Sequence, residues 1–162
     1  MNDLTLVSRL TSQMLSRFLD RALVAQRPAL VAALRPEPDD YAKVFRGEAA
    51  ARAREGYEPL WQSSIPVITP RPEQTNLMMF LALSQDFGEG HPRTRRFPGG
   101  YGKIAEHLAP DLVWACWKFV APGQSVGMAY DGLVSLGERW AWFPKPWKFV
   151  LPRASTMGHW SD

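Results

Sequence analysis

Residues 111–149 constrain the fold more than any other part of the chain, because they are apolar at most positions and contain five of the seven tryptophans. The runs 112–120 and 126–136 have strand length and are rich in Val, Trp, Phe, Leu and Ala. Between them lie Ala121, Pro122 and Gly123, where proline removes a backbone donor and glycine permits positive φ. The stretch therefore predicts three consecutive antiparallel strands.

The third of these strands follows Gly137-Glu138, a two-residue connection with glycine first, which is typical of a type II′ hairpin. Such a turn fixes which residues lie opposite one another and share a face. The predicted pairs are Leu136 with Arg139, Ser135 with Trp140, Val134 with Ala141, Leu133 with Trp142, and Gly132 with Phe143. Tyr130 then shares a face with Val134, and Asp131 shares the other face with Leu133. Neither face is polar, so we expect helices on one side and a partner chain, the C-terminal tail or a ligand on the other.

Length, charge and cysteine content limit the class of protein. A chain of 162 residues fits a single α+β domain over 1–151 with a loosely ordered tail over 152–162. The lone cysteine, Cys116, excludes an intramolecular disulfide and fits a reducing compartment. Charged residues interrupt the first twenty positions, so we expect no signal peptide or membrane span and a cytoplasmic location. A net charge of +3 is too small to indicate a nucleic-acid partner by itself.

The first 61 residues predict helices. Apolar residues recur at helical spacing over 3–25, with serines and arginines on the opposite side. A short helix is expected over 29–34, between two prolines. Pro38 and the acidic residues around it favour the start of another helix that runs over 38–61.

The middle of the chain predicts a hairpin and a loop. A short edge strand is expected over 65–69, pairing with a strand over 75–84, although Leu, Met and Ala leave a helix over 77–83 as an alternative. Residues 85–100 contain four glycines and two prolines without hydrophobic period, which predicts a long exposed loop. Two helical turns over 101–108 lead into the tryptophan-rich strands.

This order of elements resembles the NTF2-like α+β fold, the cone-shaped half-barrel of ketosteroid isomerases, polyketide cyclases and many non-catalytic domains. The resemblance is one of architecture over residues 3–150 and rests on no sequence motif. It implies N-terminal helices packed on a curved antiparallel sheet, an apolar pocket inside the cone, and an outer sheet face that serves as a dimer or partner surface.

Tyr130 and Asp131 are the candidate catalytic residues. Both lie within an apolar strand, where burial raises the pKa of a carboxyl group and makes it suitable as a general acid or base. The alternative interpretation is structural, because a carboxylate near the end of a strand also caps loops and binds backbone amides. Cys116, beside Trp117 on a strand, is expected to be a buried inert thiol.

The polar residues of the 85–100 segment form a second candidate site. His91 with Glu89 or Asp86 can bind a metal or shuttle protons, and arginines can hold a phosphate or carboxylate. The spacing matches no metal template, and an ordinary solvated loop is the alternative, so we expect no metal and no cofactor. The candidate residues are Asp86, Glu89, His91, Arg93, Arg95 and Arg96.

The tryptophans near the C-terminus suit a stacking or partner surface. Trp140, Trp142 and Trp147 can bind a planar ligand or a protein, although large aromatic residues also build cores. These residues favour a non-catalytic binding protein, of the immunity or accessory type or a homodimer, that uses the aromatic sheet face and the charged loop. A small isomerase, cyclase or hydrolase acting on an apolar substrate is the alternative, and a nucleic-acid binder using Arg93 to Arg96 is a weaker third hypothesis.

Overall fold

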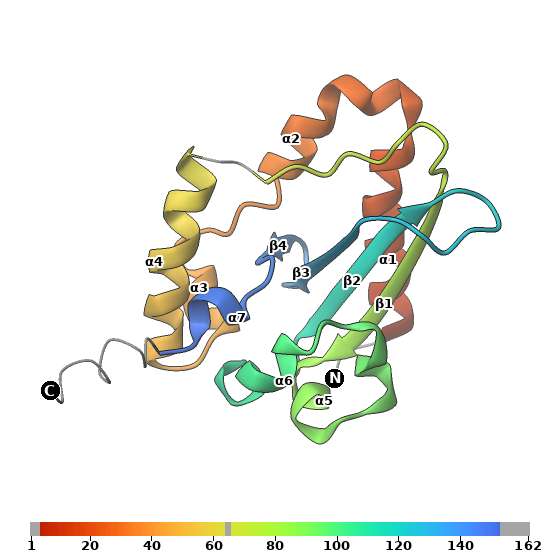
Figure 1. Ribbon diagram of the computed structural model, residues 1–162. Coiled ribbons are helices and arrows are strands. Elements are labelled where there is room, and N and C mark those ends of the chain that lie inside the picture. Colours follow the sequence, from red (N-terminus) through yellow and green to blue (C-terminus); the bar gives the residue numbers. More distant parts are fainter. Residues whose placement is uncertain (1–3, 64–65, 153–162) are drawn as a thin grey trace, which may run out of the picture.

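The computed structural model describes residues 4–63 and 66–152, in which an antiparallel four-stranded sheet is packed among helices (Figure 1). The sheet has the order β1-β2-β3-β4, and the predicted α+β class is confirmed. No helix within these ranges is both long enough and apolar enough to cross a bilayer. The elements are α1 (Leu4–Ser16), η1 (Arg17–Leu19), η2 (Arg21–Gln26), α2 (Arg27–Ala32), α3 (Asp40–Val44), α4 (Glu48–Ser63), β1 (Asn76–Leu83), α5 (Ser84–Glu89), η3 (Pro92–Arg96), α6 (Gly100–Ile104), η4 (Ala105–His107), β2 (Val113–Val120), β3 (Ala129–Ser135), β4 (Trp140–Trp142) and α7 (Trp147–Val150).

The predicted hairpin register is confirmed. Leu133, Val134 and Ser135 of β3 pair with Trp142, Ala141 and Trp140 of β4. The amide of Leu136 donates to the carbonyl of Arg139 over 2.9 Å, and the amide of Phe143 donates to the carbonyl of Gly132 over 2.7 Å. Gly137 has φ +91°, the positive value that a type II′ turn requires at its first central residue.

A β-bulge in β3 reverses the faces predicted for Tyr130 and Asp131. Ala115 pairs with Leu133 but Trp117 pairs with Tyr130, so β3 has one more residue than β2 in this interval. Gly132, at φ +90°, takes up the irregularity. The Tyr130 ring stacks on Trp117 at 5.3 Å, on the side of Leu133. Asp131 instead lies on the side of Val134.

Both faces of the sheet are covered by this chain. The face that carries Trp114, Val134 and Phe143, here called the Trp114 face, packs against Phe45 after α3 and Tyr101 of α6. The face that carries Trp117, Leu133 and Trp142, the Trp117 face, packs against α1 and against Trp61 at the end of α4. In Figure 1, α1 passes behind β1 and β2, and α5 and α6 lie in front of their lower ends. A partner chain, the C-terminal tail or a ligand was expected to cover one face, but α1 covers it instead.

The expected strand over 65–69 is wrong for residues 66–69, and position 65 lies outside the described residues. Prolines at 66 and 70 have no backbone N–H to donate to a neighbouring strand. The segment therefore crosses the Trp117 face as irregular chain that covers it. Ile68 is buried, and the Thr69 amide donates to the Tyr130 hydroxyl over 3.3 Å. The strand predicted over 75–84 is confirmed as β1, but its partner is β2.

The loop predicted over 85–100 is also wrong, because α5, η3 and the start of α6 order most of it. Phe87 and Phe97 anchor the segment, with ring centroids 5.0 Å apart, and Phe87 stacks on Tyr101 at 4.8 Å. Two isolated phenylalanines ten residues apart create no period, which is why the sequence pattern predicted a solvated loop.

The predicted helices are confirmed, but two of them are interrupted. The helix expected over 3–25 leaves α geometry at Ser16 and continues as η1 and η2, and the helix expected over 38–61 is divided into α3 and α4 by residues 45–47. The third strand stops at Trp142, because Pro144 and Pro146 flank Lys145 at φ +50°. Trp147 therefore lies in α7, whose Val150 carbonyl accepts from Arg52 of α4 over 2.6 Å. Of the tail predicted over 152–162, positions 153–162 lie outside the described residues.

Candidate functional site

The three tryptophans expected on a partner surface do not share one. Trp142 is only 3% exposed and its indole N–H donates to the Asp131 carbonyl over 2.7 Å, so it belongs to the core. Trp140 is half-buried beneath α1, where its indole N–H donates to the Thr11 hydroxyl over 3.0 Å. Trp147 packs on Tyr101 at 5.5 Å on the other side of the sheet. The three tryptophans therefore do not form the aromatic binding face that was expected of them.

The residues of the 85–100 segment separate into structural and exposed groups. Asp86 is buried at the start of α5, accepts the Leu83 amide over 2.8 Å and forms a bidentate pair with Arg93. His91 accepts the Arg93 amide at Nδ1 over 3.0 Å, and Glu89 is exposed at the end of α5. Within the described ranges, no three His, Cys, Asp or Glu side chains are grouped to hold a metal ion. Asp86 and His91 therefore shape the segment.

An open groove of about 870 Å³ lies along the outer edge of β1, and we call it the β1 edge groove. Its floor is Met79, Phe80 and Leu81, one wall is α1 and the other is η3. Within the described residues β1 pairs with β2 alone, so its other edge has no strand neighbour. An exposed edge of this kind is a template for an additional strand.

The hydrogen-bond pattern identifies the outward groups of β1. The Ser84 amide donates to the Leu112 carbonyl over 2.9 Å, one step beyond the regular β1–β2 register. In an antiparallel ladder bonded pairs alternate along the strand, so even-numbered residues of β1 direct their backbone groups at β2. The odd-numbered residues direct theirs away from the sheet, and two of them, Met79 and Leu81, line the groove.

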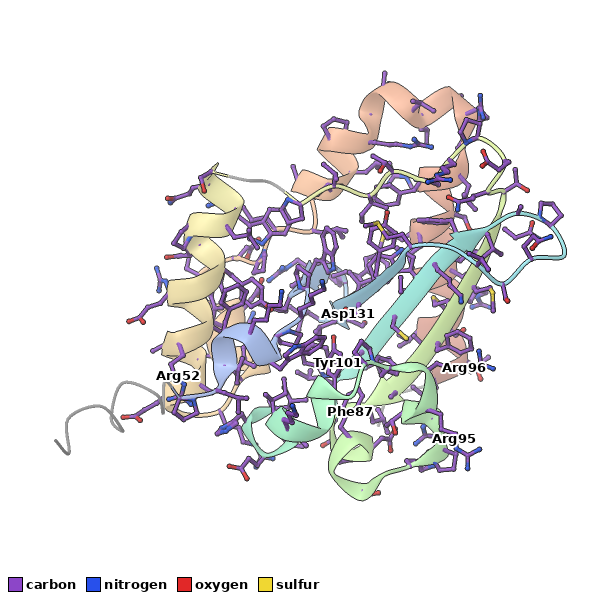
Figure 2. The ribbon with its side chains drawn as sticks, viewed as in Figure 1. Arg52, Phe87, Arg95, Arg96, Tyr101 and Asp131 are labelled. Atoms are coloured by element: carbon purple, nitrogen blue, oxygen red, sulfur yellow. The ribbon has the colours of Figure 1, made fainter. Side chains whose placement is uncertain are left out.

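The β1 edge groove is cationic. Of its twelve described lining residues, four are arginines and none is aspartate or glutamate. Arg93 is neutralised by Asp86, whereas Arg9, Arg95 and Arg96 are exposed. The Arg96 guanidinium lies over the Phe80 ring, 5.2 Å from its centroid, which holds this charge above the floor. Figure 2 shows Arg95 and Arg96 projecting from the η3 segment beside β1.

A second site, which we call the Asp131 cavity, lies on the Trp114 face and has a volume of about 260 Å³. Phe80, Cys116 and Asp131 line it from the sheet, and Phe97 and Pro98 line it from the segment between η3 and α6. Arg96 and Lys118 also line it. The fold thus brings together Asp131 and Arg96, two candidates that the sequence placed in separate sites.

Asp131 is held in a fixed orientation. The Tyr101 hydroxyl donates to Oδ1 over 2.7 Å and the Lys145 amide donates to the same atom over 2.9 Å (Figure 2 shows Tyr101 next to Asp131). Burial raises the pKa of the Asp131 carboxyl, and the hydrogen bonds from Tyr101 and Lys145 oppose this effect without cancelling it. Burial likewise raises the pKa of the Cys116 thiol to about 12, as an inert thiol requires.

We expect Asp131→Asn to gain stability relative to the wild type as the pH rises. A raised pKa in the folded state means that the folded protein binds this proton more tightly, so the contribution of Asp131 is fully present below about pH 4 and is lost as the pH rises through the folded pKa. Asparagine retains the acceptor oxygen for Tyr101 and Lys145 but does not ionise. Urea unfolding of both proteins at pH 4, 5.5 and 7 measures the difference.

Asp86→Asn serves as the matched control with the opposite sign. Burial raises the pKa of Asp86, but the hydrogen bonds from Arg93 and Leu83 and the charge of Arg93 outweigh it and lower the pKa. The contribution of Asp86 is therefore present above about pH 4 and is lost as the pH falls through the folded pKa. A stability difference that does not change with pH for Asp131→Asn would contradict the first prediction.

A third hollow, of about 400 Å³, lies between α5, α6 and η4. The charged residues that line it, Arg46, Lys103 and Glu106, are all solvent exposed. The buried polar residue of its lining, Ser84, already accepts from the Trp114 indole N–H and donates to the Leu112 carbonyl, so it is not available to select a ligand.

Sequence patterns missed several residues that complete these sites. Tyr101 lies thirty positions from its partner Asp131, and no pattern connects the two. The helical spacing of 3–25 placed Arg9 on the polar side of a helix but gave no indication that η3 lies across from it. Comparisons with protein-family models, curated proteins and solved structures found no match to this chain.

Proposed function

We propose that this chain is a binding protein that takes up an extended, acidic segment of a protein partner as an additional strand along β1. The observation that carries the proposal is the β1 edge groove, in which outward backbone groups of Met79 and Leu81 lie between exposed arginines. Backbone hydrogen bonds supply affinity in this mode of recognition, and the side chains beside the edge select the sequence. Arg9, Arg95 and Arg96 select for carboxylates.

The charge of the groove favours an acidic partner over a second copy of the chain. Pairing β1 with β1 of another copy places two arginine clusters on one continuous sheet edge, and like charges across an interface oppose association. A peptide that alternates carboxylates with apolar residues can instead pair its carboxylates with the arginines and pack its apolar side chains on the floor of the groove. A nucleic acid has no peptide backbone with which to continue the sheet, so the open edge of β1 favours a polypeptide.

The proposal is tested with a fluorescein-labelled heptapeptide that alternates valine and glutamate. Fluorescence anisotropy is expected to show saturable binding that weakens as salt is added, because exposed charges are screened. The same peptide with an N-methyl group on every backbone amide keeps its charge but cannot donate strand hydrogen bonds from either edge, and it should not bind. A peptide with lysine in place of glutamate should not bind either.

Arg95→Glu is expected to weaken heptapeptide binding about fivefold, because the exposed Arg95 contributes at most a modest ion pair and the glutamate repels the ligand. Lys103→Glu makes the same charge change at an exposed site in α6, outside the groove, and should leave the affinity unchanged. Equal binding of the N-methylated peptide would contradict strand addition. Tighter binding of a single-stranded oligonucleotide, or a dimer by light scattering that Arg95→Glu strengthens, would replace the proposed partner.

A further inference from the structure

The Asp131 cavity has the components of a small-molecule site. Its volume of about 260 Å³ lies just below the usual range of ligand cavities, and its walls include the apolar side chains of Phe80, Phe97 and Pro98. Asp131, only 7% exposed, is the buried polar group in this lining. Arg96 is exposed and Lys118 half-exposed, so two cations lie where the cavity meets solvent.

The carboxyl of Asp131 has an acceptor available for a ligand. Tyr101 and Lys145 both donate to Oδ1, and these two bonds fix the plane of the carboxyl group. Oδ2 receives neither of these donors. A ligand group that donates a hydrogen bond, such as a hydroxyl, therefore matches the buried end of the cavity, since a buried polar group discriminates strongly between ligands that satisfy it and ligands that do not.

The geometry points to a small aromatic acid as the ligand: a planar apolar body with a hydroxyl group directed at Asp131 and a carboxylate directed at Lys118 and Arg96. A ligand cation is disfavoured at the mouth, because Lys118 and Arg96 repel it. A neutral apolar ligand offers no hydrogen-bond donor to Oδ2 of Asp131. Each end of the cavity thus selects a different functional group.

This site is separate from the proposed peptide groove, although Phe80 and Arg96 line both. Lys118 and Asp131 line the cavity and not the groove, whereas Arg95 lines the groove and not the cavity. Lys118→Gln and Arg95→Glu therefore act on different ligands. Failure of one proposal leaves the other standing.

The test uses three matched probes, 4-hydroxybenzoate, benzoate and phenol, with 3-(4-hydroxyphenyl)propionate as a longer version of the first. Binding is followed by 15N-NMR titration of the full chain, in which the amides of β2, β3, Arg96 and Phe97 report on the cavity. We expect the longer or the shorter hydroxy acid to bind at least tenfold more tightly than benzoate and phenol, because only these carry both groups.

Two variants separate the ends of the cavity. Asp131→Asn keeps the acceptor for Tyr101 but replaces Oδ2 by an N–H donor. It should therefore weaken binding of the hydroxy acid about tenfold and leave the affinity for benzoate unchanged. Lys118→Gln should weaken binding of both acids several-fold and leave the affinity for phenol unchanged. Lys103→Gln, which removes a lysine outside the cavity, is the control. The inference would be overturned by any of three results: chemical shifts that do not saturate at millimolar probe, shifts centred on α5 and α6, or equal affinity for all probes.

Discussion

Gly132→Ala is expected to destabilise the protein by about 4 kcal/mol, a large part of the roughly 5–15 kcal/mol that a domain of this kind has available. Gly132 has φ +90°, which L side chains rarely adopt. A β-carbon there would lie 1.9 Å from the carbonyl oxygen of Phe143, so β4 would have to move. That movement breaks the 2.7 Å hydrogen bond from the Phe143 amide to the Gly132 carbonyl.

Gly137→Ala separates the two contributions to this cost. Gly137 has φ +91°, almost the same as Gly132, but a β-carbon there meets nothing within 4 Å. Its substitution is expected to cost only the backbone strain, about 1–2 kcal/mol. Urea denaturation of both variants gives the comparison. Equal costs would show that the approach of Phe143 to Gly132 does not limit the position of β4.

The C-terminal strands could be predicted from sequence because their register depends on local chemistry. A two-residue turn with glycine first determines every opposed pair in β3 and β4, and the structure agrees at each of them. The bulge at Gly132 could not be predicted in the same way. Glycine in a strand is compatible with a bulge, but only the neighbour β2 decides whether one residue or two oppose Cys116.

The location of the candidate sites depended on contacts between distant residues. Arg93 to Arg96 stood out as a cluster, yet whether these arginines face solvent, a ligand or a carboxylate depends on η3 and on Phe87 and Phe97 beneath it. Trp142 illustrates the opposite error. It was predicted to lie at a partner surface, but Trp61 at the end of α4 covers it, with ring centroids 6.2 Å apart. The NTF2-like cone stays a prediction.

Arg139→Leu is expected to cost about 3 kcal/mol, because it leaves a buried carboxylate without its cation. Asp40 is fully buried at the start of α3, where Oδ1 accepts from Arg139 and Oδ2 accepts from the Glu37 amide over 2.7 Å. Arg139 is one-third exposed and so retains some solvent, which places the cost at the low end for a buried pair. Its hydrogen bond to Asp40 raises the pKa of Arg139, so the guanidinium stays charged throughout the neutral range.

Two further variants decide whether the unpaired charge causes the loss. Arg54→Leu removes an exposed arginine, 3.0 Å from Glu58 on α4, and should cost less than about 0.5 kcal/mol. Adding Asp40→Asn to Arg139→Leu removes the stranded charge but keeps an acceptor for the Glu37 amide, so it should recover most of the lost stability. Urea midpoints measure all of these variants. If the double variant is as unstable as Arg139→Leu, packing of the arginine side chain rather than charge holds α3 against the β3–β4 hairpin.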